Sequence, residues 1–279
     1  MAYLLLSILA SVSNALVIKR SEMHRHDRIV VMAVNYVLAW GLTTAHWAWS
    51  GGGWPSAVTW MLGAVGGLFY AGALLLMMVA IATTGLARAA VAMRMSVVWP
   101  VLLSLVGFGE VPTPFQAAGI VLALAAVALL TLRGRLAARL PAEQGGWVVL
   151  ALFVVGGGSG VTLKLFTELG PPAERGALLP VVFGAAAVLC CTIQAVRRTP
   201  LRAGDAGSGL LFGTGNVFSN SFLLWALAEV PGVLAFPINN AGVMLLATLA
   251  GVLVWRERPG ARGYVAVALA ALAIVLMRL

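Results

Sequence analysis

The sequence predicts an all-α polytopic membrane protein with about ten transmembrane helices, arranged as two inverted five-helix repeats. The chain of 279 residues is 61% hydrophobic and 10% charged, with a mean hydropathy of +1.00, whereas soluble proteins carry about 25% charged residues. The charges lie in short clusters, and the apolar stretches between them approach the roughly 20 residues that a helix needs to cross a bilayer. This pattern excludes a soluble enzyme and a protein with a single membrane anchor.

Charges and Gly or Pro breaks bound the ten predicted spans. They cover residues 2–18, 29–49, 58–82, 87–107, 113–132, 147–166, 177–196, 208–228, 233–254 and 260–277. The first span is predicted to be a retained helix and not a signal peptide, because no Lys or Arg precedes it while Lys19 and Arg20 follow it directly. Tryptophans near span ends suit the headgroup region, where an amphipathic indole is favoured: Trp47, Trp49, Trp54, Trp60, Trp147 and Trp255.

The distribution of Lys and Arg predicts the orientation in the membrane. Fourteen of the 18 lie in loops after odd-numbered spans, and only Arg175 and Arg278 lie in the loops or terminus on the opposite side. Because cytoplasmic loops are rich in Lys and Arg, we expect a multi-pass protein of the inner (plasma) membrane with both termini outside the cytoplasm. The net charge of +9 does not indicate a nucleic-acid partner, since the basic residues are scattered over short loops and form no single surface.

An internal repeat appears when the sequence is shifted by 147 residues. Residues 1–132 then align without gaps to residues 148–279, and residues 133–147 form a basic linker. The matched pairs include Gly66 with Gly213, Gly85 with Gly232, Glu110 with Glu257, and Pro112 with Pro259. Each repeat has an odd number of spans, so the second must enter the membrane in the opposite orientation. Inverted repeats are typical of secondary transporters that expose one site alternately to the two sides.

Two stretches resemble a known transporter family. They are WPVLLSLVGFGEVPTPFQAAGIVLALAAVALL at 99–130 and FPINNAGVMLLATLAGVLVWRERPGARGYVAVALAALAIVLM at 236–277. In each, a glutamate near the span end is followed by Pro and a span rich in small residues. The chain thus resembles the EamA-type family of the drug/metabolite transporter superfamily, although Arg256 stands where that family usually has a small residue. The resemblance implies that spans one, three, four, six, eight and nine surround a central cavity, with spans five and ten peripheral.

Arg94 is the first candidate for a substrate contact. A charged group inside a span costs about 3 kcal/mol on insertion scales, so it usually faces a cavity or a partner. Arg94 could bind substrate or gate the site, or hydrogen-bond between helices. In the repeat alignment, Asn239 and Asn240 occupy a similar place in the ninth span, so we expect a pocket that contains Arg94 and Asn240. Arg88, six residues before Arg94, is expected to lie at the interface.

Further candidates lie in other spans. Asn216 and Asn220 are four residues apart and share a helix face; they either line the cavity or hydrogen-bond to a neighbouring helix. Lys164 is expected to form an i,i+4 ion pair with Glu168. The remaining candidates are apolar walls from Tyr70, Trp99 and Trp225, and gating or structural roles for Pro100, Pro237, Glu110 and Glu257.

The nine acidic residues all lie in loops or near helix ends. A proton-coupled exporter of cations of the small multidrug type needs a buried carboxylate, and this sequence offers none at mid-span. An arginine instead favours carboxylate or phosphate, which a guanidinium binds in bidentate geometry. The sequence therefore favours an anionic or zwitterionic metabolite, while binding of a cation by aromatic residues stays open.

No pattern of catalytic or metal-binding residues is found. His24, His26 and His46 lack metal-ligand spacing, the adjacent Cys190 and Cys191 have no distant partner, and no Ser, His and Asp set suggests a nucleophilic enzyme. Gly156, Gly157, Gly158 and Gly160 lack the Lys of a phosphate-binding loop and instead favour close helix packing. We expect no enzyme activity, no metal and no cofactor.

The sequence thus predicts a secondary transporter that moves a small metabolite by alternating access, as an exporter. Its partners would be that substrate and the lipid bilayer, with a homo-oligomer left open. The alternative is a membrane protein that does not itself transport, such as a subunit or partner of a lipid-carrier flippase. The Gly-rich helix faces would then be subunit contacts.

Overall fold

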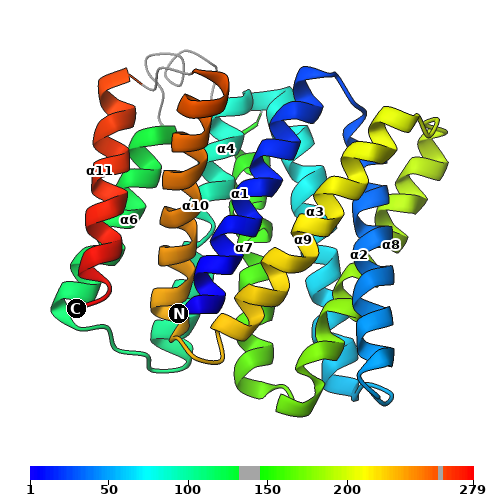
Figure 1. The fold of residues 1–279 in the computed structure, drawn as a ribbon, viewed down its shortest axis with the longest axis horizontal. Helices are drawn as coiled ribbons and strands as arrows, with labels where there is room; N and C mark the ends of the chain where they lie inside the picture. The colour runs from blue at the N-terminus through cyan, green and yellow to red at the C-terminus, as the bar shows by residue number, and fades with distance from the viewer. Residues whose placement is uncertain (132–144, 257–259) are drawn as a thin grey trace. The chain divides into compact units, whose positions relative to one another are not determined.

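The computed structural model describes residues 1–131, 145–256 and 260–279, and every regular element in these ranges is a helix (Figure 1). The all-α prediction is therefore confirmed, and each of the ten predicted spans contains a helix. The elements are α1 (Ala2–Met23), α2 (Arg28–Trp49), α3 (Ala57–Thr84), α4 (Leu86–Met95), α5 (Val98–Leu102), the π-helix η1 (Leu103–Gly107), α6 (Pro114–Thr131), α7 (Gly146–Leu169), the 3₁₀-helix η3 (Pro172–Glu174), α8 (Arg175–Arg197), α9 (Ala203–Ala226), α10 (Gly232–Trp255) and α11 (Gly260–Leu276).

Seven helical stretches of the described chain are long and apolar enough to cross a membrane. They are Ala2–Met23, Arg28–Trp49, Ala57–Thr84, Arg88–Gly107, Gly146–Leu169, Pro172–Arg197 and Gly232–Val254. Two shorter apolar helices cover Pro114–Leu129 and Gly260–Leu276. The 24-residue α9 does not reach the same apolarity, because glycine and polar residues interrupt its apolar sequence.

Three of the predicted spans need correction. The fourth is not one regular helix, since α4, α5 and η1 follow one another there. Pro100 lacks a backbone N–H, and three residues later the chain enters the π-helix, in which the N–H of Phe108 donates to the carbonyl of Leu103 at 3.2 Å. In addition, α1 continues to Met23 and α9 begins at Ala203, each five residues beyond the predicted bound, because a helix continues past the apolar segment that hydrocarbon requires.

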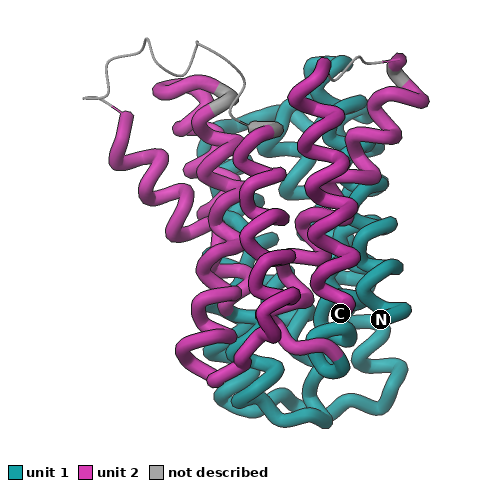
Figure 2. Tube along the Cα trace, turned by 90° about the vertical axis from the view of Figure 1, so that its left-hand side faces the viewer, with its two compact units in different colours: residues 1–71, 162–229 teal, residues 72–161, 230–279 magenta. Residues whose placement is uncertain are grey.

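The described residues form two compact units, coloured separately in Figure 2. Unit 1 comprises residues 1–71 and 162–229, and unit 2 comprises residues 72–161 and 230–279. Each unit takes helices from both predicted repeats, so these units divide the chain differently from the predicted 1–132 and 148–279. Residues 133–144 of the predicted linker lie outside the described residues.

Unit 1 is built on α1, α2, α8 and α9. In it α1 packs against α9, and α2 packs against both α8 and α9 (Figure 1). Glycines allow this close approach: an added Cβ on Gly209 would lie 2.7 Å from the carbonyl oxygen of Val31, and one on Gly213 would lie 2.9 Å from that of Asn35. Small residues at these positions thus let α2 and α9 approach closely, as in other membrane bundles.

Unit 2 contains α4, α5, α6, α10 and α11, together with parts of α3 and α7. The pair α6 and α11 packs together, α10 contacts both, and α4 contacts α6. A cluster of buried apolar side chains joins α3, α4 and α7, formed by Ala80, Ala89, Ala92, Val148 and Leu152. Gly157 of α7 faces α4 and α5 so closely that an added Cβ would lie 2.5 Å from the carbonyl oxygen of Ser96. The predicted role of the 156–160 glycines in close packing is thereby confirmed for Gly157.

Candidate functional site

Unit 1 contains three buried asparagines, Asn35, Asn216 and Asn220, and a half-buried tyrosine, Tyr70, that are hydrogen-bonded to one another. We call these four residues the asparagine cluster. The Nδ2 of Asn216 on α9 donates to Oδ1 of Asn35 on α2 at 3.1 Å. The Nδ2 of Asn220 donates to Oδ1 of Asn216 at 2.7 Å and to its carbonyl oxygen at 2.9 Å. The hydroxyl of Tyr70 on α3 donates to Oδ1 of Asn220. Three helices are therefore joined by one chain of hydrogen bonds.

Helix α1 adds polar contacts to the same face of α9. The Ser7 hydroxyl donates to the carbonyl oxygen of Ser219 at 2.9 Å, and the hydroxyls of Ser11 and Ser219 are hydrogen-bonded. In the amide orientation that satisfies both of its polar atoms, Asn14 donates to the carbonyl of Phe212 at 3.1 Å and accepts from the N–H of Asn216 at 3.2 Å. These groups of α1 were not among the predicted site residues, although each is a polar residue inside an apolar span.

The hydrogen bonds among these groups bear on the two alternatives left open for Asn216 and Asn220. Polar side chains in membrane bundles hydrogen-bond across helices and so hold them together. Both asparagines are buried and make such bonds. The geometry therefore favours a helix-joining role over direct contact with a substrate.

Lys164 forms the predicted ion pair. Its Nζ contacts Oε1 of Glu168 one turn later on α7, so the predicted i,i+4 pair is confirmed. The two side chains differ in environment: that of Lys164 is 1% exposed, whereas that of Glu168 is 37% exposed. The buried ammonium of Lys164 is therefore paired with a carboxylate that is partly accessible.

Unit 2 brings Asn240 of α10 to Arg94 of α4. The Nδ2 of Asn240 donates to the backbone carbonyl oxygen of Arg94 at 3.3 Å, so the expected proximity holds, although the bond is to the backbone and not to the guanidinium. Asn239, the next residue along, is half-buried. The guanidinium of Arg94 makes no hydrogen bond or ion pair with the residues that the structure describes, and the side chain is exposed.

The three predicted aromatic walls are divided between the units. Tyr70 belongs to the asparagine cluster of unit 1. Trp225, also in unit 1, lies beneath the guanidinium of Arg175 at 5.5 Å and beside the ring of Tyr3 at 6.2 Å. Trp99 in unit 2 packs against Phe153 with ring centroids 5.6 Å apart. Each is therefore placed by contacts within its own unit.

The two prolines are buried and contribute to packing. Pro100 lies against Gly160, where an added Cβ would be 2.9 Å from its ring. Pro237 lies inside α10.

Arg88 on α4 is half-buried and has an interaction partner.

Glu110 caps a helix. Its carboxylate accepts from the backbone N–H of Gly232 at 3.1 Å and from that of Val233 at 2.7 Å, the first two residues of α10. An anion at a helix N-terminus satisfies free N–H groups and interacts favourably with the helix dipole. Of the gating or structural roles left open, the structural role is the one these contacts support. Glu257, its predicted counterpart, lies outside the described residues.

Two further features of the described residues bear on a site, namely metal ligands and cavities. No group of three His, Cys, Asp or Glu side chains within them is arranged to hold a metal ion. A cavity in unit 1 is lined by Trp40, Trp47, Trp54 and Trp60, and none of the predicted substrate-binding residues lines it.

Comparison with known families gives a match over the first predicted repeat. The model of the EamA-like transporter family matches residues 1–132. This match bears out the resemblance to the EamA-type family of the drug/metabolite transporter superfamily for those residues. With seven described helical stretches long and apolar enough to cross a bilayer, the chain is a multi-pass membrane protein.

The fold is shared with solved structures. One of them, described only as "Crystal structure of protein", has a TM-score of 0.81 and 18% sequence identity, with 100% of this chain and 99% of that chain covered. An identity this low shows a common fold alone. No curated protein matches the chain.

Proposed function

We propose that this protein is a secondary transporter that exports a small anionic or zwitterionic metabolite by alternating access. The match of residues 1–132 to the model of the EamA-like transporter family supports the transport role. The substrate class follows from Arg94, and the mechanism from the internal repeat.

The helix bounds support the inverted repeat. Shifted by 147 residues, α2 (Arg28–Trp49) covers residues 175–196, and α8 covers Arg175–Arg197. The same shift carries α6 (Pro114–Thr131) to residues 261–278, close to α11 (Gly260–Leu276). The agreement extends beyond the matched Gly, Glu and Pro residues to the ends of whole helices, as expected if the halves descend from one five-helix unit. Such halves alternate access by rocking around a shared site.

Arg94 is the observation that carries the substrate class. Its side chain is exposed and has no partner among the described residues, although it lies within a helical stretch that is apolar enough to cross a membrane. A charge in a span needs compensation, and an exposed guanidinium without an internal partner is available to an anionic ligand. A guanidinium presents a planar fork to carboxylate or phosphate. We infer that Arg94 orients an anionic group of the substrate.

Neighbouring residues of unit 2 complete the proposed contact. Asn240 reaches the backbone of Arg94, so we infer that it and Asn239 hydrogen-bond the remaining polar atoms of the substrate. Trp99 would supply an apolar wall on the following turn. The asparagine cluster of unit 1 is assigned to holding α2, α3 and α9 together.

The experiment that tests the substrate class is ligand-dependent thermal stability of the purified protein. A ligand that binds the folded state raises apparent stability by mass action. A panel of carboxylates, phosphates, amino acids and organic cations is applied to the unmodified protein, to Arg94→Gln and to the matched control Arg88→Gln on the same helix. We expect an anion to stabilise the unmodified protein and Arg88→Gln but not Arg94→Gln. Equal stabilisation of all three proteins by organic cations would contradict the proposal.

Transport and its direction need a separate measurement. The stabilising anion is radiolabelled and loaded into proteoliposomes that contain either the unmodified protein or Arg94→Gln. Its exchange with unlabelled anion outside the proteoliposomes is then measured. Efflux from cells that express each protein then tests export. Binding without exchange in proteoliposomes would favour a non-transporting membrane subunit.

A further inference from the structure

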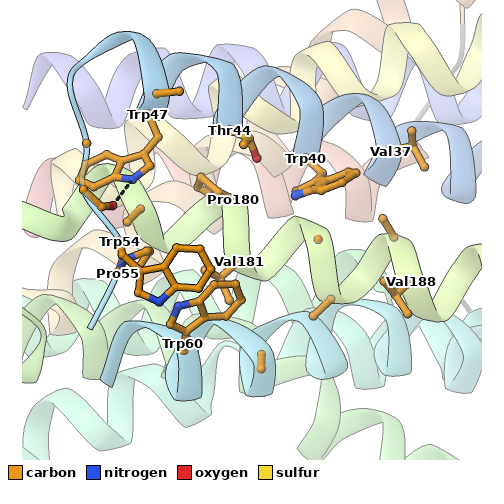
Figure 3. A pocket seen from close by; sticks show the side chains of 18 of the residues that line it. Val37, Trp40, Thr44, Trp47, Trp54, Pro55, Trp60, Pro180, Val181 and Val188 are labelled. Carbon is orange, nitrogen blue, oxygen red and sulfur yellow. Dashed lines mark hydrogen bonds between the residues drawn. The ribbon is translucent and has the colours of Figure 1, made fainter. Parts of the chain in front are cut away.

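A tryptophan-walled groove in unit 1 is a second candidate binding site. It lies among α2, α3 and α8, and encloses about 820 Å³. Figure 3 shows Trp40 and Trp47 on one side, Trp54 and Trp60 at one end, and Val181 and Val188 along the helix between them. None of its lining residues is Asp, Glu, Lys, Arg or His.

The groove is long and narrow. Its lining residues on α8 recur every three or four positions from Ala177 to Cys191, so they follow one face of the helix. Fourteen residues at about 1.5 Å each span roughly 21 Å, compared with about 30 Å for the hydrocarbon core of a bilayer. The groove is thus deep enough to take most of one extended alkyl chain from one leaflet.

Glycines of α8 let two indole rings lie close against that helix. An added Cβ on Gly184 would lie 3.1 Å from the ring of Trp40, and one on Gly176 would lie 3.0 Å from the ring of Trp47. The Nε1 of Trp47 also donates to the carbonyl oxygen of Gly53 at 3.1 Å. The two rings thus make their contacts within the unit, as the walls of a preformed binding site do.

The end formed by Trp54 and Trp60 has a different character. Their ring centroids are 5.5 Å apart, and they lie just before and within the first turn of α3, near the end of a membrane span. Within the described residues, neither indole N–H has a hydrogen-bond partner, and the side chains are 85% and 41% exposed. At a membrane interface, such rings combine apolar contact with donation to polar headgroup atoms.

We propose that this groove binds one acyl chain of a bilayer phospholipid. The indole N–H groups of Trp54 and Trp60 donate to the ester or phosphate oxygens, and the hydrocarbon chain runs along α8 toward Cys191. Charge complementarity selects this occupant, because an uncharged lining matches a hydrocarbon chain, whereas an anionic metabolite would leave its charge unpaired. The site is distinct from the one proposed around Arg94.

Lipid retention tests the proposal. The full chain is purified in mild detergent, and its phospholipid adducts are measured by native mass spectrometry. Thr44→Phe and Gly184→Leu each add bulk inside the groove from different helices, and Val196→Phe adds a similar bulk on α8 outside it, where Val196 is exposed. We expect one retained lipid in the unmodified protein and in Val196→Phe. In the two groove variants we expect lipid affinity to fall roughly tenfold, because the added side chain displaces about two methylene groups of the acyl chain from the groove.

Photo-crosslinking places the chain. A phosphatidylcholine with a diazirine at the end of one acyl chain is incorporated into nanodiscs with the protein, and crosslinked peptides are identified. We expect adducts on residues 184–191, which Thr44→Phe suppresses and Val196→Phe does not. Equal retention and labelling in every variant would overturn the proposal. So would a dimer that covers the groove without bound lipid, or displacement of the lipid by the anion that Arg94 binds.

Discussion

The asparagine cluster of unit 1 and the Arg94 region of unit 2 contrast in how their polar groups are satisfied. In the first, Asn35, Asn216 and Asn220 are buried and hydrogen-bond one another. In the second, the guanidinium of Arg94 is accessible and has no partner in the described residues. This contrast supports the proposed division of roles. In that proposal, polar side chains that hydrogen-bond one another hold helices together, whereas the exposed guanidinium of Arg94 is available to bind a substrate.

The largest expected effect separates the two roles at Arg94. Replacement by Gln removes the charge but keeps much of the side-chain volume, so we expect little change in stability, within about 0.5 kcal/mol. Substrate affinity should fall by roughly 10- to 150-fold, because a hydrogen bond to a charged group contributes about 1.5–3 kcal/mol. Equilibrium binding and unfolding of the same preparation measure both quantities. Unchanged binding would remove Arg94 from the site.

The opposite result is expected in the asparagine cluster. Asn216→Leu leaves the buried amides of Asn35 and Asn220 without their partner, which costs about 1–2 kcal/mol of stability. Substrate binding by the folded protein should be unchanged. The double variant Asn35→Leu with Asn216→Leu should cost less than the sum of the single variants, because it removes both partners together. Loss of binding with no loss of stability would identify Asn216 as a substrate contact and end the contrast.

Much of the fold could be predicted because the bilayer imposes simple requirements. A span must be apolar and of sufficient length, so the ten predicted spans follow from hydropathy and from breaks such as Gly145–Gly146. The bounds of α9 were less accurate, because Gly204, Asp205 and Gly207 made its first turns resemble a loop. The π-helix η1 was not predicted, since its hydrogen-bond register depends on how the chain after Pro100 packs against α10.

The candidate sites were predictable only in part. The alignment of the sequence with itself at a shift of 147 residues predicted that Asn240 lies close to Arg94, and the hydrogen bond from Asn240 to the Arg94 carbonyl oxygen confirms that proximity. Asn35 was missed because a single polar residue in an apolar span has no local signal of its partner, which lies 181 residues away on α9. Trp47, Trp54 and Trp60 lie near span ends as predicted. Trp40, inside α2, was not among the predicted residues, and the arrangement of all four around one groove depends on tertiary packing.

The smallest expected effect on stability concerns Glu110, which also forms its hydrogen bonds within the protein. Its carboxylate caps α10 through the N–H groups of Gly232 and Val233, and loss of a helix cap costs about 1 kcal/mol. Glu110→Ala should therefore lower the unfolding free energy by about that amount. Glu110→Gln should lose less, because an amide oxygen can still accept. Neither should alter substrate affinity at equilibrium. Glu110 is ionisable like Arg94, but its carboxylate already accepts hydrogen bonds from the protein. If its replacement lowered substrate affinity as much as Arg94→Gln does, internal hydrogen bonding would not distinguish structural residues from binding residues in this protein.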